Sequence, residues 1–152
     1  MEKVNHEKLD YKYEKLIKSL KALDKSIKVF SSPAIPEEFK SELVASLIKH
    51  YEMCFEASCK FLQLYLKQKY NIDLAANMSK TIFKTCYENK IIDWETSQEL
   101  LPIVDARNAT THDYDEEEAH ETCKRVSGYY KTFKKLIDFI EKSGYSGNSN
   151  II

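Results

Sequence analysis

The chain has 152 residues, of which 43% are hydrophobic and 31% are charged, a balance typical of a folded globular protein rather than a disordered one. Its 23 Lys and Arg residues nearly equal its 24 Asp and Glu residues, and the net charge is -1. This charge excludes a protein that coats nucleic acid nonspecifically, because that role needs a strongly positive surface. Any contact with nucleic acid must therefore be confined to a local site.

Only 3 Gly and 3 Pro residues occur, which predicts long helices, because sheet-rich folds need many tight turns. The length is that of one domain, which we place at residues 1–142, followed by a flexible tail rich in Gly, Ser and Asn at residues 143–152. The chain begins without the apolar segment of a signal peptide and contains no apolar run long enough to span a membrane. We therefore expect a cytoplasmic protein without membrane contact.

The first half of the chain predicts two long helices. Apolar residues recur at steps of three and four over residues 7–30, and the two prolines within residues 31–36 end this helix. A second and longer helix is predicted over residues 37–70, with two neighbouring rows of apolar side chains. A stripe of this width indicates a helix that contacts several others.

The second half begins with a connector at residues 71–77 and a short helix at residues 78–90. Asp93 is placed to cap the fourth helix, which should run from Trp94 to about residue 111. Pro102 lies inside that helix, so we expect a kink or a restart there.

The last helix should begin at Asp115, because Glu118 three residues later completes a capping box. It runs to about Lys142, with Gly144 as its stop. No segment has the alternation of a strand. The sequence therefore predicts an all-α protein, an up-and-down four-helix bundle with one additional short helix.

Neither the cysteines nor the acidic residues predict a metal site. The cysteines form no C-x-x-C pair, so buried free thiols are expected at Cys54, Cys59, Cys86 and Cys123. The acidic run at residues 113–118 is explained by the favourable interaction of carboxylates with a helix N-terminus. We expect neither a metal nor another cofactor.

The end of the fourth helix carries the residues best suited to chemistry. Arg107 and Arg125 are the only arginines in a chain that is otherwise basic through lysine. Asn108 and His112 lie four residues apart and so share a helix face, which the long side chain of Arg107 can also reach. A guanidinium suits a phosphate, and a histidine can transfer a proton near neutral pH. Taken alone, these residues also allow a plain helix-capping role.

This segment resembles the signature of HEPN domains, and in particular the branch called nucleotidyltransferase substrate-binding proteins. The resemblance covers about residues 8–142. Its first block matches at Arg107, Asn108, Thr110, His112, Tyr114, Asp115 and Glu116. Its second block, on the longest helix, matches at Tyr51, Glu52, Phe55, Glu56 and Lys60. Lys80 and Lys84 stand where the family tends to have arginines.

The resemblance implies a five-helix protein that forms a homodimer and works with a separate minimal nucleotidyltransferase. In the related HepT toxins, the arginine and the histidine act in RNA cleavage that needs no metal. By position, Arg107 would stabilise the developing charge on the phosphate and His112 would move the proton. Asn108 would orient the scissile group, and Tyr114 would be the residue to which the partner adds AMP.

The second block gives further expectations. Glu52 and Lys60, together with Thr111, are candidates to line the cleft between two copies of the chain. Glu56 and Lys60 lie four residues apart, so an ion pair along one helix is the simplest role for Glu56.

Two functions of different classes follow. The first is an endoribonuclease toxin that uses Arg107 and His112 against an RNA such as a tRNA or an mRNA, within a two-gene toxin–antitoxin module. The alternative is a non-catalytic substrate-binding subunit of a two-component nucleotidyltransferase. A scaffold whose motif only caps a helix is a third, weaker interpretation.

Overall fold

A computed structural model describes residues 6–112 and 116–145 of the chain, apart from the side chains of residues 110–112. Within these residues the chain is helical and contains no strand. A short 3-10 helix, η1 (Glu37–Phe39), precedes the second of the α-helices. The α-helices are α1 (His6–Phe30), α2 (Lys40–Tyr70), α3 (Ser79–Glu88), α4 (Trp94–His112) and α5 (Glu116–Lys142).

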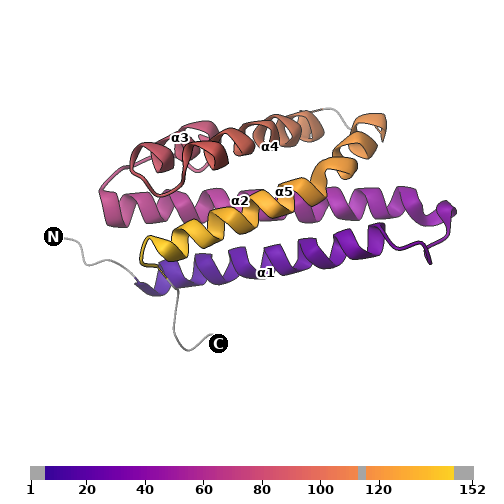
Figure 1. Cartoon of the computed structure of the whole chain (residues 1–152), viewed down its shortest axis with the longest axis horizontal. Coiled ribbons are helices and arrows are strands. Elements are labelled where there is room, and N and C mark those ends of the chain that lie inside the picture. Colours follow the sequence, from indigo (N-terminus) through magenta and orange to yellow (C-terminus); the bar gives the residue numbers. More distant parts are fainter. Residues whose placement is uncertain (1–5, 113–115, 146–152) are drawn as a thin grey trace.

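The helices form the predicted bundle (Figure 1). The two N-terminal helices, α1 and α2, pack along their lengths, and α5 crosses both of them. On the other side of α2 lie α3 and α4, and α4 also packs on α5. The all-α four-helix bundle is confirmed, with α3 as the additional short helix.

The longest helix, α2, forms the centre of the core because it contacts α1, α3 and α5. The completely buried Tyr51 and Phe61 belong to it, and Phe133 of α5 and Leu16 of α1 close the core around them. The expected free and buried thiols are also confirmed at Cys54, Cys59, Cys86 and Cys123.

The helix ends follow local rules that were readable in the sequence. The backbone N–H of Thr96 donates to the carboxylate of Asp93 over 2.8 Å, which confirms the predicted N-cap of α4. Gly144 has a φ of +104°, and its N–H donates to the carbonyl of Glu141 at 3.1 Å. This left-handed residue closes α5 as expected, since glycine adopts such a φ without steric cost.

Two features differ from the sequence-based expectation. Residues 37–39 form η1 rather than the first turn of α2. Of the kink or restart expected at Pro102, the restart does not occur, because α4 is continuous from Trp94 to His112. Leu100 and Ile103 on either side of the exposed proline are completely buried, so core packing holds the helix together where one backbone hydrogen bond is missing.

Several predicted features lie in segments that the structure does not describe. The capping role of Asp115 and most of the tail lie outside the described residues. Tyr145, at the end of the described chain, packs against Tyr13 and Phe61. None of the described helices is both long and apolar enough to cross a membrane.

Candidate functional site

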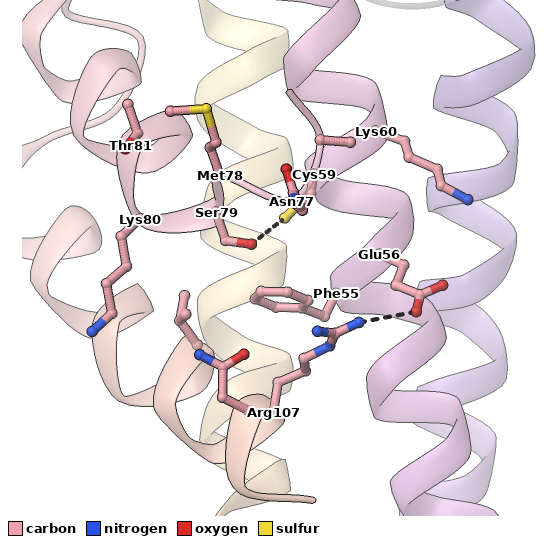
Figure 2. A pocket seen from close by; sticks show the side chains of 13 residues that line it. Phe55, Glu56, Cys59, Lys60, Asn77, Met78, Ser79, Lys80, Thr81 and Arg107 are labelled. Carbon is pink, nitrogen blue, oxygen red and sulfur yellow. Dashed lines mark hydrogen bonds and ion pairs between the residues drawn. The ribbon is translucent and has the colours of Figure 1, made fainter. Parts of the chain in front are cut away.

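A cavity of about 590 Å³ opens between α2, α4 and the segment that leads into α3 (Figure 2). From α2 it is lined by Phe55, Glu56, Cys59 and Lys60. The segment from Ala76 to Thr81 forms a second wall, and Val104, Arg107 and Asn108 of α4 form the third. Three elements that are separate in the sequence therefore meet at this cavity.

Arg107 is held on α2 by two contacts. The central carbon of its guanidinium lies 5.7 Å from the centre of the Phe55 ring, within the range of a cation–π interaction. One terminal nitrogen, Nη2, donates to Oε1 of Glu56 at 3.3 Å (Figure 2). The side chain is 29% exposed, so it remains accessible from the cavity. An aromatic platform and one carboxylate thus orient the guanidinium.

A buried hydrogen bond sets the position of α4 against α2. The hydroxyl of Tyr51 donates to the backbone carbonyl of Ile103 over 2.6 Å, one turn before Arg107. Burial raises the pKa of Tyr51, so its phenol stays protonated and remains a donor at any physiological pH. This bond places the Arg107 side chain above the ring of Phe55, one turn further along α2.

The cavity gathers more positive than negative groups. Besides Arg107, the lining includes Lys60 and Lys80, and Glu56 supplies its one carboxylate among the residues that the structure describes. Lys80 also pairs with Asp105 of α4 over 2.8 Å, which ties α3 to α4. Such an arrangement suits a phosphate group, which the planar guanidinium can bind through two hydrogen bonds.

Cys59 is not a nucleophile of this cavity, although it forms part of the lining. Its thiol lies 3.6 Å from the hydroxyl of Ser79. Burial raises the pKa of the thiol to about 11, so it stays protonated at neutral pH and reacts poorly. Its contribution is the contact that holds the start of α3 against α2.

Only some of the site residues predicted from the sequence line the cavity. Arg107, Asn108 and Lys60 line the cavity. Glu52 is absent from its lining, and Glu56, one turn later on α2, occupies the wall instead. The expected ion pair between Glu56 and Lys60 is wrong, because Glu56 pairs with Arg107 across the two helices. The guanidinium lies above Phe55 and next to Glu56, which favours this partner over Lys60.

The other predicted site side chains lie outside the residues that the structure describes. The side chains of Thr111 and His112 are not described, and neither is Tyr114. The backbone of α4 does extend to His112, so this residue follows Arg107 on the same helix.

Sequence reasoning missed the platform role of Phe55 and the wall formed by residues 76–81. Phe55 stands in the second family block, but only its position beneath Arg107 reveals its role. Apart from Lys80, which the family resemblance singles out, no local pattern marks residues 76–81, since they become part of the cavity only through the turn between α2 and α3.

Comparisons with known proteins identify a family and a fold. The sequence profile of a family described as "Nucleotidyltransferase substrate binding protein like" matches residues 11–142. No curated protein sequence matches the chain significantly.

Three solved structures have a similar fold. A protein from Thermus thermophilus is 23% identical with a TM-score of 0.68, over 82% of this chain and 98% of that chain. The tri-AMPylated HEPN toxin of Shewanella oneidensis, solved in complex with an MNT antitoxin, is 22% identical with a TM-score of 0.66, over 84% and 96%. A mutant of the toxin–antitoxin pair MntA–HpeT is 22% identical with a TM-score of 0.66, over 85% and 98%.

Proposed function

The chain belongs to the nucleotidyltransferase substrate-binding protein family of HEPN-like proteins, and we propose that it partners a minimal nucleotidyltransferase in a two-gene toxin–antitoxin module. Two of the similar structures are named as a HEPN toxin with an MNT antitoxin and as a toxin–antitoxin pair. In this proposal the partner is the antitoxin, and this chain is the toxin.

The proposed activity is endonucleolytic cleavage of RNA without a metal ion. The observation that carries it is the position of Arg107, oriented by α2 and exposed to a cavity rich in positive groups. Arg107 binds the scissile phosphate and stabilises the charge that develops on it. Asn108, which also lines the cavity, orients the same group.

His112, five residues after Arg107 on α4, supplies the proton transfer in this proposal. It accepts the proton of the ribose 2′-hydroxyl while the 2′-oxygen attacks the phosphorus. The bond from phosphorus to the 5′-oxygen breaks, and that oxygen takes up a proton. The products are a 2′,3′-cyclic phosphate and a 5′-hydroxyl. We place two such motifs in one cleft of a homodimer.

The test is incubation of the purified protein with total RNA and a tRNA panel in EDTA. We expect the wild type to leave 2′,3′-cyclic phosphate ends, and Arg107→Ala and His112→Ala to lose at least about 100-fold in rate. Arg125→Ala is the matched control, because Arg125 is exposed on α5 and away from the cavity. It should cleave like the wild type.

A second candidate function follows from the Glu56 carboxylate, which partly neutralises Arg107. A non-catalytic binding subunit tolerates the Arg107–Glu56 ion pair better than a nuclease does, because a nuclease needs the guanidinium for the phosphate. If neither the wild type nor any variant cleaves RNA, the proposed toxin activity is wrong. The protein is then a non-catalytic substrate-binding subunit of its nucleotidyltransferase.

AMP addition provides an independent prediction. We expect the co-expressed nucleotidyltransferase and ATP to modify Tyr114, and Tyr114→Phe to abolish the mass increase of one or more AMP groups. The exposed tyrosine of α3, Tyr87, is the control, and Tyr87→Phe should be modified normally. AMP on any other residue in the tandem mass spectrum would refute the assignment to Tyr114.

A further inference from the structure

A second groove, of about 510 Å³, runs between α1 and α2. It shares Glu56 and Lys60 with the Arg107 cavity, so the two concavities meet along α2. Figure 2 shows the Lys60 side chain extending from α2 toward α1. From α1 the groove is lined chiefly by Tyr11, Lys12, Lys15 and Lys18.

The lysines of this groove form an elongated positive strip. Lys12, Lys15 and Lys18 follow one another at three-residue steps on α1, which spreads them over about 9 Å along the helix axis. Lys60 of α2 faces them from the opposite wall. A strip of this length matches a chain of successive phosphates better than a single small anion.

The positive charges are poorly compensated. Lys18 pairs with Glu14 at 3.2 Å, but within the described residues no carboxylate pairs with Lys12. Burial lowers the pKa of Lys12, and the ammonium groups of Lys8, Lys60 and Lys15 lower it further. The folded protein therefore holds like charges close together, and a bound polyanion relieves that repulsion.

Two exposed nonpolar groups accompany the lysines. Tyr11 is 56% exposed, and the ammonium group of Lys15 lies 5.0 Å from the centre of its ring. Met53 of α2, also in the groove, is 50% exposed. Lysines beside an accessible aromatic ring are the usual combination for single-stranded nucleic acid, because the ring stacks on a base while the lysines bind the backbone.

We propose that the groove between α1 and α2 binds the RNA strand that flanks the scissile phosphate held at Arg107. This assignment rests on the proposed ribonuclease function and extends it, because it names a single-stranded substrate and its path. The strand passes Lys60 and Glu56, where the groove meets the cavity. Glu56 stays paired with Arg107 and is the only carboxylate among the described residues that line both concavities.

The experiment measures binding of a fluorescein-labelled oligouridine by fluorescence polarisation over a series of KCl concentrations. His112→Ala serves as the background, so that no cleavage interferes. Lys12→Gln/Lys15→Gln should weaken binding about tenfold at low salt and reduce the slope of log K against log[KCl] by about 1.4. Tyr11→Ala should weaken binding about fivefold or more through lost stacking.

The matched control is Lys21→Gln/Lys25→Gln, which removes the same charge from exposed positions of α1 outside the groove. We expect less than about a twofold change. Equal losses in both pairs would mean that only bulk charge matters, and the proposal would be wrong. An unchanged affinity of the Lys12→Gln/Lys15→Gln protein for oligouridine would also refute the proposal. So would a variant that binds RNA normally and loses only its binding to the nucleotidyltransferase.

The two proposals fail in distinguishable ways. If the wild type cleaves RNA and the groove variants bind and cleave normally, the groove assignment alone is wrong. If the wild type binds oligouridine through the groove without cleaving any RNA, the groove is a site for single-stranded RNA and the nuclease proposal fails.

Discussion

Glu56 controls the electrostatics of the Arg107 cavity. Its carboxylate is 50% exposed and lies 3.3 Å from the guanidinium, where it competes with any phosphate for the same donors. An ion pair this exposed contributes at most about 1 kcal/mol to stability. Its main effect is therefore on what Arg107 binds.

We predict that Glu56→Gln raises the affinity for uncleaved oligouridine about threefold to tenfold and lowers the free energy of unfolding by less than about 1 kcal/mol. Fluorescence polarisation and urea unfolding measure the two effects. Glu121→Gln, which removes an exposed carboxylate of α5, is the control and should change affinity less than about twofold. In an Arg107→Ala background the gain should shrink, and a full gain there would contradict the competition.

The site residues show which features one sequence can reveal. Arg107 and Asn108 were identified as candidates from residue type, spacing and family resemblance, and both line the cavity. The partner of Glu56 was predicted wrongly, because spacing along one helix identifies neighbours on that helix only. The partner that it has lies 51 residues away on α4.

At the scale of the elements, the end of α3 holds a residue in an unfavourable backbone conformation. Lys90 has a φ of +62°, and its N–H donates to the carbonyl of Tyr87 at 3.0 Å. The next N–H, from the buried Ile91, donates to the carbonyl of Cys86 at 2.9 Å. This is a Schellman motif with lysine where glycine is preferred.

We predict that Lys90→Gly stabilises the protein by about 0.5–1 kcal/mol. Glycine removes the cost of the left-handed conformation, which exceeds the added entropy of the unfolded chain. The Lys90 side chain is exposed, so no packing is lost. Thermal and urea unfolding measure the change. Lys90→Ala is the control and should have little effect, because alanine shares the steric cost of lysine. Destabilisation by glycine would mean that the lysine side chain itself matters.

Pro102 shows how packing overrides a local signal. Proline breaks hydrogen bonding inside a helix, and an isolated peptide would favour an end of the helix at this residue. In the folded chain the neighbouring Leu100 and Ile103 are completely buried, and α4 continues. Much of the stability of a helix comes from its buried face, so one missing backbone bond is tolerated.

At the scale of the whole molecule, the thiols report on the integrity of the bundle. All four cysteines are buried, and they come from α2, α3 and α5. Burial raises the pKa of Cys54 and Cys86 to about 12. It raises the pKa of Cys59 and Cys123 to about 11.

We predict that a disulfide reagent such as DTNB leaves the native protein unlabelled at pH 8 for minutes and labels four thiols after unfolding in guanidinium. Raising the pH toward 11 should speed labelling, because the thiolate is the reactive form and its fraction grows as the pH approaches the raised pKa. Cys59 should react first, since it lines the cavity. A thiol that reacts natively as fast as in the unfolded chain would contradict the packing of its helix.

The sequence by itself determined the helices, the N-cap at Asp93 and the stop at Gly144, because each depends on residues within a few positions of one another. Only the tertiary structure decided that Arg107 rests on Phe55 and pairs with Glu56, and that a lysine groove adjoins this cavity. Those contacts join residues from different helices, and their energies depend on how the helices pack. Spacing along the chain does not encode that packing.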